Sequence, residues 1–138
     1  MGAKPDKVVV HVDGGARGNP GPAAVAAVAA DAAGEVLREA YEFIGNTTNN
    51  VAEYRAVLFG LELARELGAA SVEVVNDSEL VARQIEGRYK VKNAGLKPLY
   101  LETMKALRGF GDWSVRSVRR ERNERADELV NEALDQAG

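Results

Sequence analysis

Hydrophobic residues recur with two periods along the chain, and these periods separate predicted strands from predicted helices. Alternating or β-branched apolar runs predict strands over residues 7–13, 22–31, 36–45, 71–76 and 113–119. Apolar positions three and four residues apart predict helices over residues 51–67, 77–87, 96–111 and 123–138. The alanine-rich stretch 22–31 would also suit a helix, but Pro22 and the turn after it favour a strand of a hairpin.

The order of these elements predicts the fold class. Three strands come first and are joined by short turns, so we expect them to be antiparallel. Strands and helices then alternate, which favours parallel additions to the same sheet. We therefore predict an α/β fold with a five-stranded mixed sheet flanked by helices, formed by one domain over residues 1–138.

The composition limits the compartment and the partners that we expect for this domain. The 138 residues include no cysteine, which excludes disulfides and thiolate metal sites and favours a reducing compartment. No apolar run approaches the length of a membrane span, and the start, "MGAKPDK", lacks the apolar core of a signal peptide. We expect a cytoplasmic monomer without a membrane partner. The formal net charge of −3 means that any site for a polyanion has to be local.

Four acids stand where buried elements begin or end. Asp13 is the last residue of the first predicted strand and Asp77 comes at the carboxyl end of the strand 71–76, while Glu53 and Asp127 lie near the starts of two largely apolar helices. Functional groups collect at such strand ends in α/β sheets. Clustered carboxylates repel one another unless cations neutralise them, and an all-oxygen ligand set suits Mg²⁺ or Mn²⁺.

Each acid also has a purely structural explanation. Asn50 and Glu53 match a capping box, and Asp77 could cap the helix that follows it. Asp127 could favour a helix N-terminus through its charge, and Asp13 could be a turn residue before Gly14. The occurrence of all four acids indicates a metal site more specifically than any one of them does.

The segments around these acids resemble type 1 ribonuclease H over nearly the whole chain. The matching segments, in the family's order, are "VDGGARGNPGPAA", "TTNNVAEYRAV", "VVNDSELVARQIEG", "YKVKN" and "RNERADELVNEA". The resemblance implies the ribonuclease H-like fold and hydrolysis of the RNA strand of RNA/DNA hybrids. It implies two Mg²⁺ (or Mn²⁺) ions per active site, and 5′-phosphate and 3′-hydroxyl products. The implied catalytic and metal-binding residues are Asp13, Glu53, Asp77 and Asp127.

The resemblance also implies a substrate-binding groove. The positions that match its contacts are Gly14, Gly15, Asn19, Thr48, Asn49 and Asn50. Glycine lets a main chain approach a sugar-phosphate closely, and the "GNPGP" segment reverses the chain into the next strand. Some relatives carry amides where this chain has Glu79 and Arg83, so the resemblance leaves contacts there open.

The chain departs from the best-known members of the family in two ways. They carry a histidine in the loop before the last helix, whereas the one histidine here, His11, is expected to be packed in the core. Glu121 is a candidate substitute as proton carrier. The family's basic helix and loop is also shortened, since eight residues separate Gly87 from Leu96. Arg119, Arg120 and Arg122 are the candidate phosphate contacts, and Tyr89 and Trp113 could pack on sugars.

Three functions are compatible with these features. The first is a metal-dependent endoribonuclease acting on RNA/DNA hybrids. The second is a non-catalytic hybrid-binding module of the same fold, which the presence of all four acids disfavours. The third is another phosphoryl-transfer enzyme of this fold, which the Asn-rich loop disfavours. A phosphate-binding loop of the nucleotide-binding type is excluded by pattern, because no such glycine motif is present.

Overall fold

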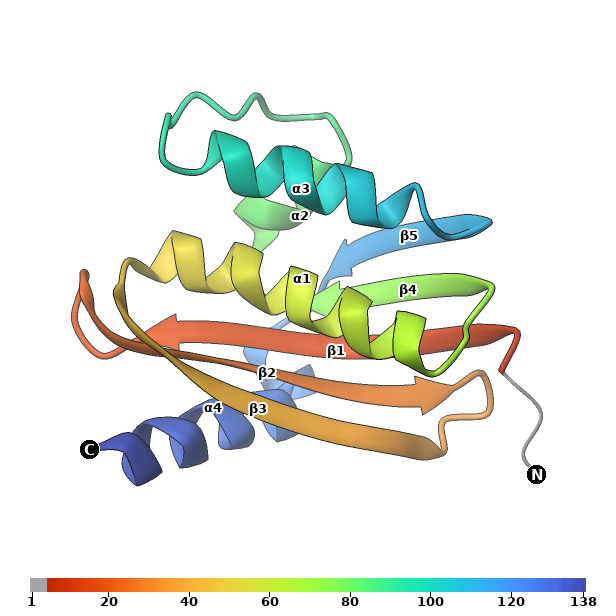
Figure 1. Ribbon diagram of the computed structural model, residues 1–138, viewed down its shortest axis with the longest axis horizontal. Coiled ribbons are helices and arrows are strands. Elements are labelled where there is room, and N and C mark those ends of the chain that lie inside the picture. Colours follow the sequence, from red (N-terminus) through yellow and green to blue (C-terminus); the bar gives the residue numbers. More distant parts are fainter. Residues whose placement is uncertain (1–4) are drawn as a thin grey trace.

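A single mixed sheet organises the computed structural model, which describes residues 5–138. Its strands are β1 (Lys7–Ala16), β2 (Gly21–Asp31), β3 (Val36–Thr47), β4 (Ser71–Asn76) and β5 (Asp112–Ser117). The strand order is β3-β2-β1-β4-β5, with β1, β2 and β3 antiparallel and with β4 and β5 parallel additions (Figure 1). The predicted fold class is confirmed.

Helices cover both faces of the sheet. One face carries α1 (Asn49–Glu66), α2 (Glu79–Ile85) and α3 (Lys97–Leu107), and the other carries α4 (Glu124–Ala137) (Figure 1). A short 3₁₀ helix, Arg120–Arg122, leads from β5 into α4. In the described part of the chain no helix is both long and apolar enough to cross a membrane. Residues 1–4, which belong to the start examined for a signal peptide, lie outside the described residues.

Strand β2 separates two hydrophobic cores. Its residues Val25, Ala27 and Ala29 face the core beneath α1, and Ala24, Ala26 and Val28 face α4. Successive side chains of a strand point to opposite faces, so burial of both sets makes β2 apolar throughout. The predicted apolar face of the last helix is also confirmed, because Ala126, Leu129, Val130, Ala133 and Leu134 are all buried.

Two helices begin on caps that differ from those predicted. The Thr48 hydroxyl accepts a hydrogen bond from the Val51 N–H, and the Ser78 hydroxyl accepts one from the Val81 N–H. These hydroxyls satisfy amides that a helix start leaves unpaired. The capping-box explanation of Asn50 and the N-cap explanation of Asp77 are therefore wrong.

Three further expectations need correction. Strand β1 continues three residues past Asp13, so this acid lies within the strand and is not a turn residue. His11 is only partly buried and lines a hollow with Arg122 and Arg125, and is not packed in the core. Leu80, which helical spacing predicts on the buried face of α2, is 39% exposed. The other predicted boundaries differ from the observed ones by a few residues, as helix and strand ends commonly do.

Two glycines allow α1 to lie directly on β1. A Cβ at Gly14 would lie 2.1 Å from the Ala52 carbonyl oxygen, and a Cβ at Gly60 would lie 2.4 Å from Cγ1 of Val12. Both distances are far below van der Waals contact. Gly14 therefore serves helix packing, and the close approach of substrate at this position stays a prediction. Gly15 differs, because its Cβ would be 3.8 Å from the nearest atom.

Alanine substitutions at Gly14 and at the neighbouring Gly15 test this packing. We expect Gly14→Ala to lower the free energy of unfolding by at least about 2 kcal/mol, because backbone has to move to admit the methyl group. Gly15→Ala is the matched control and should change it by less than about 1 kcal/mol. Urea denaturation of both variants measures the difference. Equal stabilities would show that α1 does not press on β1 at Gly14.

Candidate active site

Four acids from four different elements line one cavity of about 220 Å³. Asp13 comes from β1, Glu53 from α1, Asp77 from the link between β4 and α2, and Asp127 from α4. The sheet brings the carboxyl ends of the parallel strands β1 and β4 together, and both helix N-termini lie near that end (Figure 1). The residues predicted as metal ligands are thus neighbours in space.

Buried amide side chains hold these elements in register. The side-chain N–H of Asn123, which is 2% exposed, donates to the Val12 carbonyl at 2.8 Å and ties the start of α4 to β1 beside Asp13. On the other side of the cavity, the Asn76 side chain accepts from the Ser78 N–H at 2.7 Å and donates to the Arg116 carbonyl. These bonds position Asp127 and Asp77 on either side of Asp13.

Asp13 is the electrostatic centre of the cluster. It is 9% exposed, and burial together with the charges of Asp77 and Asp127 and a hydrogen bond to Asp127 raises its pKa to about 8. The Arg120 guanidinium opposes this rise. Without added cations, the Asp13 carboxyl is therefore largely protonated near neutral pH.

The other inner acids are shifted in the same direction. Burial raises the pKa of Glu53, the charge of Asp77 raises it further, and a hydrogen bond from the Ser78 hydroxyl opposes the rise. Burial likewise raises the pKa of Asp77, against the opposing charge of Arg120. Shifts of this kind concentrate at functional sites, because folding alone gives no reason to bury acids together.

The donor set fits divalent metal ions. All four acids offer oxygen, and Oε2 of Glu53 is buried without a hydrogen-bond partner. Such an atom is costly unless a ligand satisfies it, and hard cations prefer carboxylate oxygens. In the part of the chain described, no three acid or histidine side chains are already drawn together closely enough to hold an ion. Ligation therefore requires side-chain rotation around the shared cavity.

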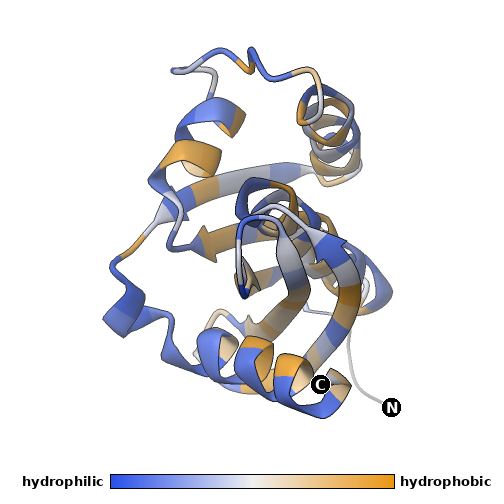
Figure 2. Cartoon of the chain, turned by 90° about the vertical axis from the view of Figure 1, so that its left-hand side faces the viewer, coloured by the Kyte–Doolittle hydropathy of each residue, from blue (hydrophilic) through white to orange (hydrophobic). Residues whose placement is uncertain are grey.

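Arg120 supplies the cation nearest to the acids. Its Nε lies 3.9 Å from Oδ2 of Asp77, and the side chain lines the same cavity while remaining 80% exposed. Arg119, Arg122 and Glu121 instead line a neighbouring open hollow with Ser117 and Val118. The structure thus does not bring Glu121, the predicted proton carrier, together with the four acids. The segment between β5 and α4 is strongly hydrophilic (Figure 2).

Three of the six predicted substrate contacts, Gly14, Gly15 and Asn49, line the acid cavity. Asn49 accepts a hydrogen bond from the Ala16 N–H at 3.0 Å, and its own N–H donates to the Asn19 side chain at 3.0 Å. Thr48 caps α1. The exposed side chain of Asn50 has no hydrogen-bond partner among the described residues. Asn19, Thr48 and Asn49 therefore have structural roles, and the substrate contacts expected of them stay predictions.

The remaining candidates do not line the acid cavity. Glu79 pairs with Arg83 along α2, and the Arg83 guanidinium lies 5.6 Å from the centre of the exposed Tyr89 ring. Trp113 packs against the larger core. Residues 88–96 form no helix between α2 and α3, in agreement with the expected shortening of the basic protrusion.

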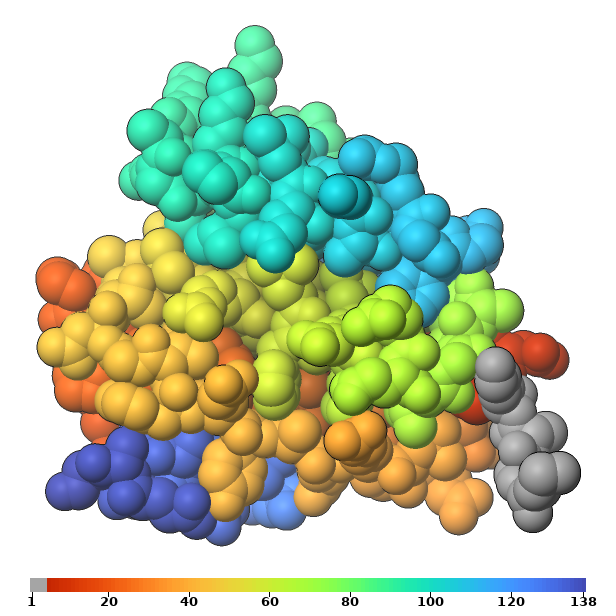
Figure 3. Space-filling model, in the orientation of Figure 1, coloured from red at the N-terminus to blue at the C-terminus, as the bar shows by residue number. Residues whose placement is uncertain are grey.

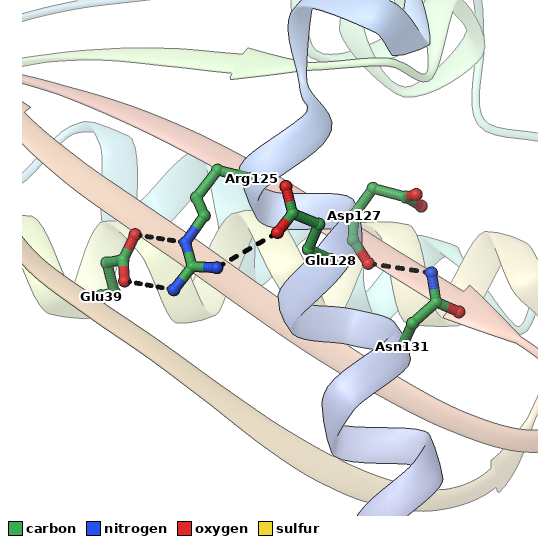
Figure 4. Close-up of polar contacts among 5 residues, drawn as sticks. All are labelled: Glu39, Arg125, Asp127, Glu128 and Asn131. Atoms are coloured by element: carbon green, nitrogen blue, oxygen red, sulfur yellow. Dashed lines mark hydrogen bonds and ion pairs between the residues drawn. The ribbon is translucent and has the colours of Figure 1, made fainter.

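Sequence reasoning missed two polar residues of the cavity. Arg17 pairs with Asp135 at 2.8 Å, contacts Asn131, and thereby joins the β1–β2 turn to α4. Asn131 also donates to the Asp127 carbonyl at 3.1 Å, as Figure 4 shows beside the pair formed by Arg125 and Glu39. Asn131 could have been found, since it lies one helical turn after Asp127.

The fold and the acid cluster together define the class of protein: a ribonuclease H-like α/β domain with a carboxylate site at the edge of β1. A family model described as "Reverse transcriptase-like" matches residues 11–133. Ribonuclease HI of Halobacterium salinarum is 43% identical over 131 residues, which cover 95% of this chain and 66% of that protein. The crystal structure of RNase H1 from the same organism has a TM-score of 0.92 at 42% identity, covering 94% of this chain and 98% of that one.

Two further relatives extend the comparison. LC11-RNase H1, solved in complex with an RNA/DNA hybrid, has a TM-score of 0.90 at 44% identity and covers 94% of this chain and 98% of that one. A bifunctional protein of Mycobacterium tuberculosis is 46% identical over 132 residues, which are 95% of this chain and 36% of that protein. The chain belongs to the type 1 ribonuclease H family.

The raised pKa of Asp13 predicts an unusual pH dependence of stability. Because the folded-state pKa of about 8 lies above the unfolded value of 3.8, protonation favours the folded state. In chelator, the free energy of unfolding should fall as pH rises from about 4 to about 8, with at most about 1.4 kcal/mol per pH unit from Asp13 and a contribution of the same sign from Glu53 and Asp77. Urea denaturation across this range measures the slope.

Asp13→Asn is the matched variant, since it keeps the shape of the side chain and removes the titrating group. Its slope between about pH 5 and about pH 8 should be clearly shallower than that of the wild type. Mg²⁺ should stabilise the wild type more at the upper end of this range than at the lower end, because the metal competes with protons for the same oxygens. Identical slopes for the two proteins would contradict the electrostatic account of the cluster.

Proposed function

We propose that this chain is a metal-dependent endoribonuclease that hydrolyses the RNA strand of RNA/DNA hybrids. The observation that carries the proposal is the convergence of four carboxylates on one cavity, with the pKa of the central one raised to about 8. The chain spans 66% of the length of the halobacterial relative and 36% of the mycobacterial one, so it corresponds to part of each. The relative solved with an RNA/DNA hybrid supports this choice of substrate.

The acids would hold the cations that the reaction requires. Asp13, which interacts with both Asp77 and Asp127, would hold Mg²⁺ or Mn²⁺ together with them, and Glu53 would complete the set. Two bound cations activate the attacking water and stabilise the leaving oxygen of a phosphodiester. We expect 5′-phosphate and 3′-hydroxyl products.

The chain's own residues would orient the hybrid. RNA is distinguished from DNA by its 2′-hydroxyls, which the wide minor groove of a hybrid displays. Asn19 in the β1–β2 turn is bonded to Asn49 at the start of α1, and Asn49 lines the acid cavity, so short polar groups lie beside the acids. Asn49 is held by two backbone contacts and is pre-positioned, whereas Asn50 is free to contact substrate.

Arginines near the cavity would attract the phosphates. Arg120 lines the acid cavity and Arg119 and Arg122 line the neighbouring hollow, in a chain whose net charge is −3. Arg119 and Arg122 make no ion pair within the described chain. A local cationic surface can bind a polyanion even when the whole molecule is acidic.

Cleavage assays on labelled duplexes test the function directly. Wild-type protein with Mg²⁺ or Mn²⁺ should cut the RNA of a hybrid, and chelator should abolish the cutting. Asp13→Asn should reduce the rate at least about 100-fold, because the variant loses the charge of the central acid that would hold the cations. Product ends are read by phosphatase sensitivity.

Two matched substrates distinguish the alternatives. Binding of the hybrid without cleavage in any metal would favour the non-catalytic module, and cleavage of a DNA duplex of the same sequence would favour a different phosphoryl-transfer enzyme. Glu121→Gln tests whether Glu121 is the proton carrier. If it is, the variant should turn over more slowly, and unchanged turnover would exclude Glu121 from that role.

Salt dependence tests the role of the arginines in phosphate binding. Replacing Arg119 or Arg122 by alanine should weaken hybrid binding and reduce the slope of log affinity against log salt by about 0.9 for each phosphate that the variant no longer neutralises. The control is Arg65→Ala, because Arg65 is an exposed arginine in the last turn of α1, far from the acids. Fluorescence anisotropy with Asp13→Asn as the background avoids cleavage during the measurement. Equal salt-dependence slopes for all variants would show that other residues bind the phosphates.

A further inference from the structure

One arginine of the acid cavity has no part in the function proposed above. Arg17 lies in the turn between β1 and β2 and lines the cavity together with the four acids. Its guanidinium reaches α4, where Nη2 lies 2.8 Å from Oδ1 of Asp135 and 3.4 Å from Oδ1 of Asn131. Figure 3 shows this turn, in red-orange, on the same side of the molecule as the dark blue end of α4. Arg17 is therefore a cation at the edge of the acid site, as Arg120 is.

The main chain of Arg17 is fixed, whereas most of its guanidinium is free. The Arg17 N–H donates to the Pro22 carbonyl at 2.8 Å, and a Cβ at Gly21 would lie 2.2 Å from the Arg17 carbonyl oxygen. The turn therefore closes tightly around this residue. The side chain is 49% exposed, and both of its contacts with α4 are made by Nη2. Within the described chain Nε and Nη1 make no hydrogen bond or ion pair, so their N–H groups can donate to a ligand.

The pair with Asp135 is too weak to hold Arg17 against a stronger anion. Asp135 is 69% exposed, and an ion pair between two exposed side chains contributes little to stability, because water screens both charges. A phosphate group offers several oxygens to the planar fork of a guanidinium and forms stronger, charge-assisted hydrogen bonds with it. A phosphate brought to the cavity would therefore draw the Arg17 side chain away from α4.

The size of the cavity limits which phosphate Arg17 can meet. In the proposed function, the phosphate to be cleaved lies at the cations that the four acids hold. The cavity is only about 220 Å³, so the side chains that line it are within reach of a phosphate seated there. Arg120 reaches the same cavity from the link between β5 and α4, beside Asp77. The two arginines thus come from separate elements, an arrangement that suits a phosphate backbone crossing the site.

We propose that Arg17 is a substrate-binding residue that leaves Asp135 and contacts a phosphate of the RNA strand when an RNA/DNA hybrid covers the acid site. In the free protein Asp135 holds the side chain on α4, and so keeps it from pairing with the carboxylates that bind the cations. The contact sets the affinity for the hybrid and takes no part in the chemical step. This role of Arg17 rests on the proposed function, since it requires a hybrid seated over the acids.

Fluorescence anisotropy with a labelled hybrid, in the Asp13→Asn background that suppresses cleavage, tests the contact. Adding Arg17→Ala should weaken binding at least about tenfold and lower the slope of log affinity against log salt by about 0.9, because one phosphate is no longer neutralised. Arg17→Lys should keep the slope and lose part of the affinity, since lysine retains the charge without the planar fork. In the cleaving protein, Arg17→Ala should raise KM by a similar factor and change kcat less than about threefold.

Asp135→Asn separates this role from that of a strut between the turn and α4. Removing the competing carboxylate should strengthen hybrid binding about twofold to fivefold. In the Arg17→Ala background the same change should have almost no effect, because the side chain that Asp135 restrains is absent. A strut would instead lose affinity in either variant, and simple repulsion between Asp135 and the phosphates would be relieved equally in both backgrounds.

The exposed pair of Arg38 and Glu66 is the matched control. It joins β3 to α1 as Arg17 and Asp135 join the turn to α4, and neither Arg38 nor Glu66 lines the acid cavity. Arg38→Ala and Glu66→Gln should each leave the affinity for the hybrid within about twofold of the parent value. Urea unfolding midpoints close to that of the wild type check that every variant is folded.

Three outcomes would overturn the role of Arg17. They are binding and salt slope unchanged by Arg17→Ala, weaker binding by Asp135→Asn, and equal gains from Asp135→Asn with and without Arg17. The proposed function fails on different evidence. Wild-type protein that binds the hybrid but does not cut it in Mg²⁺ or Mn²⁺ would contradict the nuclease activity and leave the binding role of Arg17 standing. Cleavage of the hybrid with binding unchanged by Arg17→Ala would do the reverse.

Discussion

Mutual repulsion among buried carboxylates is the constraint that the site depends on. Asp13 is almost enclosed, and the negative charges of Asp77 and Asp127 act on it from both sides. Folding has to offset this cost elsewhere. The structure does so with well-packed apolar layers on both faces of the sheet and with the buried amide of Asn123, which holds α4 against β1. The resulting site is poised to bind positive charge.

The acid site can receive positive charge from an arginine side chain or from divalent cations, and the two differ in how many carboxylate oxygens they can contact. Arg120 reaches the cavity from an exposed 3₁₀ turn and opposes the rise in the pKa of Asp77 without enclosing it. An exposed arginine cannot satisfy several inward-facing oxygens together, and Oε2 of Glu53 stays without a partner. Small divalent cations can approach all of these oxygens, because they are spherical and carry twice the charge. The arginines outside the cavity are then available for phosphates.

The sequence predicted the sheet, the apolar face of α4 and the four acids, because each of these leaves a local pattern or a family motif. It did not predict the true helix caps, since Asn50 and Asp77 are as good capping residues as Thr48 and Ser78. The packing role of Gly14 depends on Ala52, which is remote in sequence. The exposure of Leu80 and of His11 likewise depends on which neighbouring elements cover them, and this is decided by tertiary structure.

The alanine-rich strand β2 explains how helices on opposite faces of the sheet can both contribute acids to one site. Asp13 pairs across the ladder with Ala26, a fully buried residue on the face that α4 covers. Small side chains along β2 let α4 lie close to the sheet, and the glycines Gly14 and Gly60 do the same for α1 on the other face. Glu53 and Asp127 thus approach β1 from opposite sides. The small side chains of β2, a strand that carries none of the four acids, therefore set the spacing of those acids.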